Sequence, residues 1–133
     1  MRQITLAAVL ALTLVACGDD GATGGSNLES AVVDYCDALL GGDADTGYSL
    51  LSARCQKTIG PDEFAVAVSQ IAERYGDASM TSYTEDVDRQ VGIVTYRYND
   101  SAIDQEDQQW TREDGGWRND ECTQRLFGGR VPR

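Results

Sequence analysis

The side chains of this chain that could do chemistry are its cysteines, tyrosines and carboxylates, because the sequence contains no histidine. The lack of histidine excludes Ser–His and Cys–His nucleophilic catalysis within this chain, and also histidine-ligated zinc hydrolysis. No glycine-rich phosphate loop follows a predicted strand, and no nucleophile elbow occurs. The chemistry that remains is acid–base catalysis by carboxylates and tyrosines.

Five tyrosines are candidates for such a site, because they could face a cavity with Asp86 or Asp100 nearby. They are Tyr35, Tyr48, Tyr83, Tyr96 and Tyr98. The alternative is that these tyrosines belong to the core or its rim while the acids are solvated. We favour this alternative, because no acid stands alone inside an apolar strand pattern. We therefore assign no catalytic residue from the sequence.

The N-terminal segment carries one positive charge, Arg2, followed by an apolar stretch over residues 4–16. This stretch is shorter than the about 20 residues that a membrane-spanning helix needs, and it matches the apolar core of a secretory signal. A buried N-terminal helix is the alternative. It is disfavoured because the stretch has no polar face. Residues 1–16 are therefore interpreted as a signal peptide.

The tetrapeptide Leu14-Val15-Ala16-Cys17 closely resembles the lipobox of bacterial lipoproteins. The resemblance implies that a diacylglyceryl group is transferred to the sulfur of Cys17, whose thiolate is a strong nucleophile. It also implies that the chain is cleaved after Ala16. Two acyl chains give stable membrane attachment without a membrane span. We therefore expect a lipid-anchored protein on the extracytoplasmic face of the cell membrane.

Acidic residues outnumber basic ones by 22 to 11, and loss of Arg2 with the signal peptide takes the net charge from −11 to −12. Such a surface repels nucleic-acid phosphates and anionic lipid headgroups. No nucleic-acid partner is therefore expected, and the simplest interpretation of the acids is that they keep an exposed domain soluble. Short acidic runs such as residues 43–45 lack the ligand order of a calcium loop.

With Cys17 lipidated, three cysteines remain in an oxidising setting where a disulfide can persist. Cys36 and Cys55 fall on the apolar faces of adjacent predicted helices, which favours a Cys36–Cys55 disulfide. Its loop of about 20 residues would add about 3 kcal/mol of stability. The alternative is Cys55–Cys122, which would join the second helix to the last strand. Three scattered cysteines without histidine do not form a metal site, so neither a metal nor a cofactor is expected.

The chain divides into segments that would position these residues. Residues 18–25 contain four glycines and no apolar periodicity, which is typical of a flexible tether. The predicted segments are the signal peptide 1–16, the lipidated cysteine and tether 17–27, a folded domain 28–127 and a C-terminal tail 128–133.

Apolar residues three and four apart predict helices in the first half of the domain. One helix covers residues 28–40. Asp43 can cap a second, shorter helix that continues to Cys55 with its apolar residues on one face. The third helix is the clearest, because Pro61 starts it and Gly76 follows its last turn.

After Gly76 the apolar period changes from 3.6 to 2, which predicts strands. The Asp114-Gly115 dipeptide lies between two tryptophans and is a strong tight-turn signal. The predicted strands cover residues 78–87, 91–98, 103–113 and 117–122, and the third of them is polar, as in a strand that exposes one or both faces. Helices followed by an antiparallel meander indicate an α+β fold in which the helices cover the apolar face of the sheet.

At this level the sequence resembles the nuclear-transport-factor-2-like superfamily, in which N-terminal helices pack on the concave face of a curved antiparallel sheet to form a cone. The resemblance is carried by "YCDALLGGDADTGYSLLSARC", "PDEF", "VTYRY" and "WTREDGGWRNDEC". Because the superfamily includes enzymes, ligand-binding domains and assembly modules, the resemblance implies a fold and leaves several functions open. We expect a non-enzymatic domain that binds a small apolar ligand or an envelope protein. The alternative is an isomerase or dehydratase that uses Asp and Tyr groups in the cone.

Overall fold

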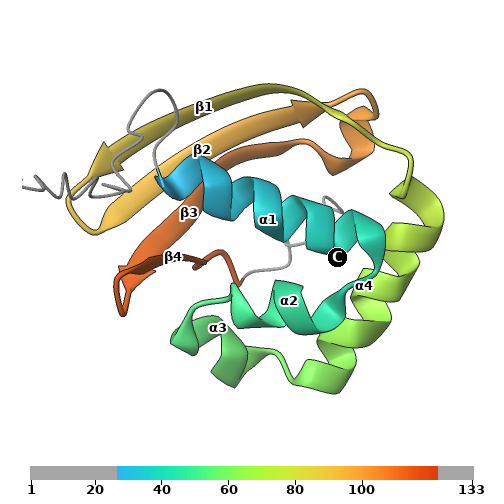
Figure 1. Ribbon diagram of the computed structural model, residues 1–133, viewed down its shortest axis with the longest axis horizontal. Helices are drawn as coiled ribbons and strands as arrows, with labels where there is room; N and C mark the ends of the chain where they lie inside the picture. The colour runs from blue at the N-terminus through green and yellow to red at the C-terminus, as the bar shows by residue number, and fades with distance from the viewer. Residues whose placement is uncertain (1–26, 123–133) are drawn as a thin grey trace, which may run out of the picture.

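The computed structural model describes residues 27–122 (Figure 1). The predicted signal peptide, the lipidation site Cys17 and the tail 128–133 lie outside the described residues. No helix within residues 27–122 is long and apolar enough to cross a membrane. The described part holds four helices followed by four strands and one short 3₁₀ helix, η1. The elements are α1 (Asn27–Gly41), α2 (Ala44–Ser49), α3 (Ala53–Thr58), α4 (Pro61–Tyr75), β1 (Met80–Asp88), β2 (Val91–Tyr98), η1 (Ser101–Ile103), β3 (Gln105–Glu113) and β4 (Gly116–Asn119).

The first and third predicted helices are confirmed as α1 and α4, but the prediction of one continuous second helix is wrong. The chain forms the two short helices α2 and α3 instead. Between them the chain leaves the helical conformation at Ser52 and bonds to the last strand. The Ser52 N–H donates to the carbonyl of Asn119 at 2.8 Å, and the Asn119 N–H donates to the carbonyl of Leu50 at 2.7 Å. These bonds to a distant strand replace the helical bonds that local spacing favoured.

The predicted antiparallel meander is confirmed, with the strands in the order β1-β2-β3-β4. The turn between β3 and β4 consists of two residues, Asp114 and Gly115, both with positive φ angles of 51° and 77°. This is the backbone of a type I′ turn, whose twist matches that of the strands. At the far edge of β4, Leu51 forms a parallel bridge to Asn119.

The expected α+β class is confirmed, and all four helices lie on one side of the sheet (Figure 1). This arrangement is consistent with a cone-like fold. β2 shows the alternation that the sequence predicts, because Val94, Tyr96 and Tyr98 are buried while Arg97 between them is exposed. The helices meet this face with apolar residues three and four apart, among them the buried Leu28, Val32, Tyr35, Leu39, Phe64 and Val68.

Candidate functional site

Three of the five predicted tyrosines do come together, around the thiol of Cys36. Tyr35 and Tyr96 are almost completely buried, and Tyr98 is 9% exposed. Tyr96 and Tyr98 lie edge to face with ring centres 5.9 Å apart, and both line the same small cavity as Cys36. We call Tyr35, Cys36, Tyr96 and Tyr98 the tyrosine–thiol cluster. It fills the space between α1 and β2.

A buried polar chain continues from the tyrosine–thiol cluster along β3. The Gln108 side-chain oxygen accepts from the Tyr96 hydroxyl at 3.1 Å and from the indole N–H of Trp110 at 2.8 Å. The amide group of Gln108 in turn donates to Gln105 at 3.4 Å. Buried polar groups that are satisfied in this way stabilise one arrangement of a core. The tyrosines of β2 therefore belong to the packed interior, as the structural interpretation of the sequence favoured.

The remaining two tyrosines lie elsewhere, so the five candidates do not share one site. The Tyr48 hydroxyl donates to the carbonyls of Gln56 and Ile59, both at 2.9 Å, and so ties α2 to α3. Tyr83 lies half-buried on β1, where its hydroxyl is 3.5 Å from the carboxylate of Glu85. The spacing of tyrosines along the chain carries no information about which helix pair or strand each one joins.

The cavity beside the tyrosine–thiol cluster is small. Its volume is about 30 Å³, and it is lined by Cys36, Leu39, Leu40, Ile71, Tyr96, Tyr98, Ile103 and Gln105. A single water needs about 10–15 Å³ on this scale, whereas ligand pockets usually measure about 300–1,000 Å³. The cavity therefore has room for one or two waters and excludes a small-molecule substrate.

Two larger hollows lie on the surface, and both carry charged residues. One, of about 370 Å³, is lined partly by Asp34, Asp37 and Asp43 between α1 and α2. The other, of about 220 Å³, includes Arg74 and Asp100. Neither contains a residue of the tyrosine–thiol cluster. Charged, open surfaces of this kind do not suit an apolar ligand, which gains affinity by removing apolar area from water.

No aspartate or glutamate among residues 27–122 is buried, and Asp86 and Asp100, the two predicted partners of the tyrosines, are both exposed. An isomerase or dehydratase, the alternative function, needs a carboxylate inside its cavity to move a proton. The described part of the chain does not supply that group.

Burial also removes the reactivity of the cluster. Loss of hydration raises the pKa of the Cys36 thiol to about 11, although the hydroxyls of Tyr98 and Tyr96 partly oppose this by bonding to the sulfur. Burial likewise raises the pKa values of Tyr35, Tyr96 and Tyr98. All four groups are neutral at pH 7. None can act there as a thiolate nucleophile or a phenolate base.

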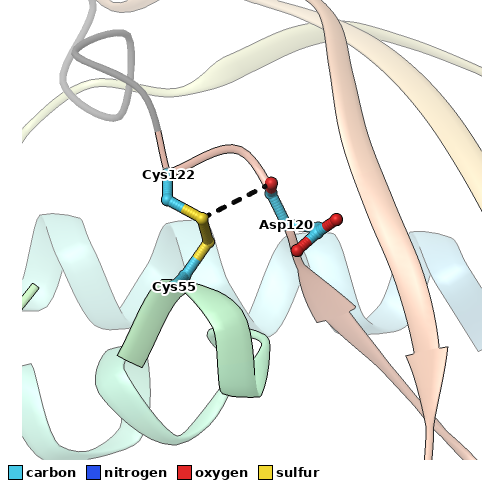
Figure 2. A group of neighbouring side chains, drawn as sticks. All are labelled: Cys55, Asp120 and Cys122. Atoms are coloured by element: carbon cyan, nitrogen blue, oxygen red, sulfur yellow. Dashed lines mark hydrogen bonds between the residues drawn. A yellow bond between two sulfur atoms is a disulfide. The ribbon is translucent and has the colours of Figure 1, made fainter. Parts of the chain in front are cut away.

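The favoured disulfide, Cys36–Cys55, is wrong, and the pair is Cys55–Cys122. Cys36 points from α1 toward the tyrosines of β2, whereas Cys55 lies on α3, which packs at the far edge of β4. The bridge joins residues 67 positions apart and has a Cα–Cα distance of 5.0 Å (Figure 2). Helical periodicity correctly placed both cysteines on buried faces, but it could not say which element each face would meet.

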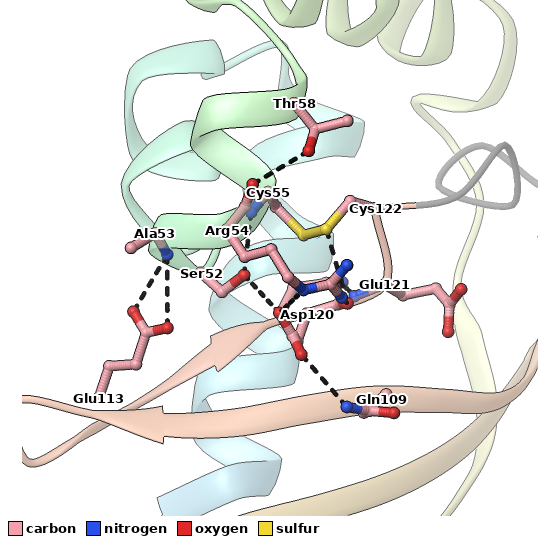
Figure 3. A network of polar contacts seen from close by, with 11 residues as sticks. Ser52, Ala53, Arg54, Cys55, Thr58, Gln109, Glu113, Asp120, Glu121 and Cys122 are labelled. Carbon is pink, nitrogen blue, oxygen red and sulfur yellow. Dashed lines mark hydrogen bonds and ion pairs between the residues drawn. A yellow bond between two sulfur atoms is a disulfide. The ribbon is translucent and has the colours of Figure 1, made fainter.

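A polar network surrounds the disulfide, and we call it together with the bridge the disulfide junction (Figure 3). Its centre is the carboxylate of Asp120, which accepts from the Ser52 hydroxyl at 2.6 Å, the Arg54 guanidinium at 3.1 Å and the Gln109 amide at 3.2 Å. A second carboxylate, Glu113, accepts from the Ala53 N–H at 3.1 Å. These contacts hold the start of α3 against β3 and the end of β4.

The disulfide junction also brings together three groups with metal-binding chemistry, which the sequence did not suggest. The sulfurs of Cys55 and Cys122 and a carboxylate oxygen of Asp120 all lie within 4.8 Å of one another. The only signal for Asp120 is that it precedes Cys122 by two residues. Nothing local indicates that Cys55 would join them.

Comparison of the chain with protein-family models and with curated proteins gave no match.

Proposed function

We propose that this protein is a lipid-anchored lipoprotein of the extracytoplasmic side of the cell envelope, and that its folded domain binds a protein partner and catalyses no reaction. The partner in this proposal includes the membrane, reached through a diacylglyceryl group on Cys17, the last residue of the lipobox-like tetrapeptide. The proposed domain belongs to the nuclear-transport-factor-2-like class, whose cone the observed arrangement of helices and sheet resembles.

The observation that carries the proposal of an extracytoplasmic location is the Cys55–Cys122 disulfide. Disulfides persist in oxidising compartments and are rare in the cytosol, where thiols are kept reduced. The disulfide and the lipobox-like tetrapeptide are separate features of the chain, because one depends on tertiary contacts and the other on the first 17 residues. Both point to export.

The packed interior supports a protein partner over a small apolar ligand. The cavity at the tyrosine–thiol cluster measures only about 30 Å³, so a ligand would have to displace core side chains. The sheet face away from the helices is uncovered within the described residues (Figure 1). It presents Ile93, Thr95 and the 41%-exposed Val91 from β2. Mixed apolar and polar surfaces are typical of protein interfaces.

Membrane fractionation in the native cell tests the anchor. Replacement Cys17→Ser removes the sulfur that would carry the lipid, so we expect the variant to leave the membrane fraction and to keep its leader. Cys36→Ala is the matched control, because it removes a cysteine outside the lipobox-like sequence and should stay with the membrane. Retention of Cys17→Ser at the wild-type level would show that the protein is held in some other way.

Site-specific photo-cross-linking tests the binding role. A photoreactive residue at Ile93 on the outer sheet face should give a defined protein adduct in intact cells. The same residue at Val66, which is 61% exposed on α4, should not. Native mass spectrometry of the purified protein provides the opposing result: a small molecule that co-purifies at one equivalent and is lost only on unfolding would identify a ligand-binding protein instead.

A further inference from the structure

The disulfide junction carries an inference that is independent of the proposed function. Figure 2 shows the sulfurs of Cys55 and Cys122 beside Asp120. The two sulfurs and a carboxylate oxygen of Asp120 all lie within 4.8 Å of one another. Zn²⁺ takes thiolate and carboxylate ligands in tetrahedral sites, and three protein ligands leave the fourth position for water. While the two sulfurs are bonded to each other, neither is a thiolate, and the donor set is incomplete.

We propose that reduction converts the disulfide junction into a binding site for Zn²⁺, with Cys55, Cys122 and Asp120 as ligands. A dithiol reductant breaks the S–S bond, supplies two electrons and two protons, and is itself oxidised to a disulfide. Zn²⁺ then replaces the two thiol protons, which are released to solvent as two Zn–S bonds form. The same sulfurs therefore serve either as a covalent link or as metal ligands.

The contacts around the sulfurs do not depend on the S–S bond, so they can hold the ligands in place after reduction. The Ser52 hydroxyl, at the N-cap of α3, and the Gln109 amide, on β3, fix the Asp120 carboxylate. The Ser52 N–H bonds to the carbonyl of Asn119, and the Asn119 side chain accepts from the Glu121 N–H at 2.9 Å. Such outer contacts orient metal ligands and strengthen binding.

Arg54 opposes the metal and gives the proposal a distinctive signature. Its guanidinium bonds to the same Asp120 carboxylate, at 3.1 Å, and its side chain is 61% exposed. A cation beside the site repels Zn²⁺ and competes for the carboxylate oxygen. A second guanidinium nitrogen of Arg54 donates to the Asp120 backbone carbonyl, so the charge is held beside the site. Removing this charge should strengthen metal binding.

Cobalt titration of the reduced protein tests the site. The full chain with Cys17→Ser and Cys36→Ala keeps Cys55 and Cys122 as its only thiols. After reduction with dithiothreitol and removal of the reductant without oxygen, one equivalent of Co²⁺ should produce thiolate-to-cobalt charge-transfer absorption and the intense visible bands of tetrahedral cobalt. Zn²⁺ should displace both signals. The oxidised protein, treated in the same way, should show neither.

Variants then separate this site from two thiols that bind metal without it. Asp120→Asn, which keeps the shape of the side chain, should weaken Zn²⁺ binding roughly ten-fold or more. Arg54→Gln should strengthen it several-fold. Unchanged affinity in Asp120→Asn, or equal binding by oxidised and reduced protein, would overturn the proposal.

X-ray absorption at the zinc edge keeps the proposal testable if a variant fails to fold. Circular dichroism identifies such a variant, and the absorption measurement needs only the reduced wild-type chain. It should count two sulfur ligands at about 2.3 Å, with oxygen ligands completing the site. A shell with only oxygen and nitrogen neighbours would contradict the assignment.

Discussion

At the scale of single residues, the Cys36 thiol and three of the tyrosines are buried, whereas the carboxylates lie near solvent. Cys36 is the free thiol of the described residues, and it lies 4% exposed among tyrosines that cannot ionise at neutral pH. The carboxylates, in contrast, remain near solvent. Enzyme sites bring such groups together in a cleft and shift their pKa values toward the working pH. Here burial shifts the pKa of the thiol away from it.

The pKa of Cys36 predicts how stability depends on pH. The thiol has an ordinary pKa of 9.0 and a folded-state pKa of about 11. Between these values the unfolded chain loses a proton that the folded chain keeps, so rising pH favours unfolding. The loss should be on the order of 2 kcal/mol. Urea unfolding at successive pH values measures it.

The control for this pH dependence is Cys36→Ala, which removes the titrating thiol. The buried tyrosines also have raised pKa values and lower the stability of both proteins at high pH. The wild type should therefore lose more stability than the variant between pH 9 and 11. If the free energy of unfolding of the two proteins fell in parallel with pH, the thiol would ionise in the folded protein at its ordinary pKa.

At the scale of elements, the disulfide junction decides where α3 lies. α3 is only six residues long, too short to be stable as an isolated helix. It is held by Ser52, Arg54 and Cys55, and all three reach residues at the end of β4 (Figure 3). The division of the predicted second helix into α2 and α3 and the Cys55–Cys122 pairing therefore have the same cause, which is the contact between this segment and β4.

Removal of the disulfide should destabilise the fold. The bridge closes a loop of 67 residues, and Cys122→Ser should lower the free energy of unfolding by about 4 kcal/mol through the freedom gained by the unfolded chain. Urea unfolding measures the loss. Reductant should destabilise the wild type by a similar amount and leave the variant unchanged. A reductant effect on Cys122→Ser would mean that another bond or contact responds.

The β3–β4 turn gives a second prediction at this scale. Gly115 has a φ of +77°, and an added Cβ would meet no atom within 4 Å. Gly115→Ala should therefore cost about 1–2 kcal/mol through backbone strain alone. Thermal unfolding measures the change. Gly41→Ala, at the equally open end of α1, should be neutral or stabilising. Equal destabilisation by both substitutions would contradict the turn geometry.

At the scale of the whole molecule, the main feature is the negative charge at the surface of the folded domain. The chain carries a net charge of −11, and the described acids lie at or near the surface of a packed body. Like charges at a surface keep a protein soluble and also destabilise its compact state. A domain held close to a membrane by a short tether would present this charge to its neighbours, which favours partners with basic or neutral surfaces.

Salt should therefore stabilise this protein. Raising NaCl from low to physiological concentration screens the repulsion among the acids, and the urea midpoint of unfolding should rise. KCl should have the same effect as NaCl, because screening does not depend on the identity of the ion. A midpoint that falls with salt would show that attractive ion pairs, such as Arg54 with Asp120, outweigh the repulsion.

The sequence by itself determined the features that depend on neighbouring residues. The period of apolar residues predicts α1, α4 and the first two strands, and Asp114-Gly115 predicts the turn that joins the last two, because each depends on contacts within a few positions. Order along the chain then determines the α+β class. The lipobox-like tetrapeptide is also local, and the anchor at Cys17 stays a prediction.

Only the tertiary structure decided what the buried faces meet. Cys55 reaches Cys122 across 67 residues, Ser52 and Arg54 reach Asp120, and Tyr48 separates from the tyrosines of β2. Periodicity states that a residue is buried but not against which element, since several pairings of helix and strand bury similar apolar area. The choice among them depends on non-local hydrogen bonds and packing, which the sequence pattern does not display.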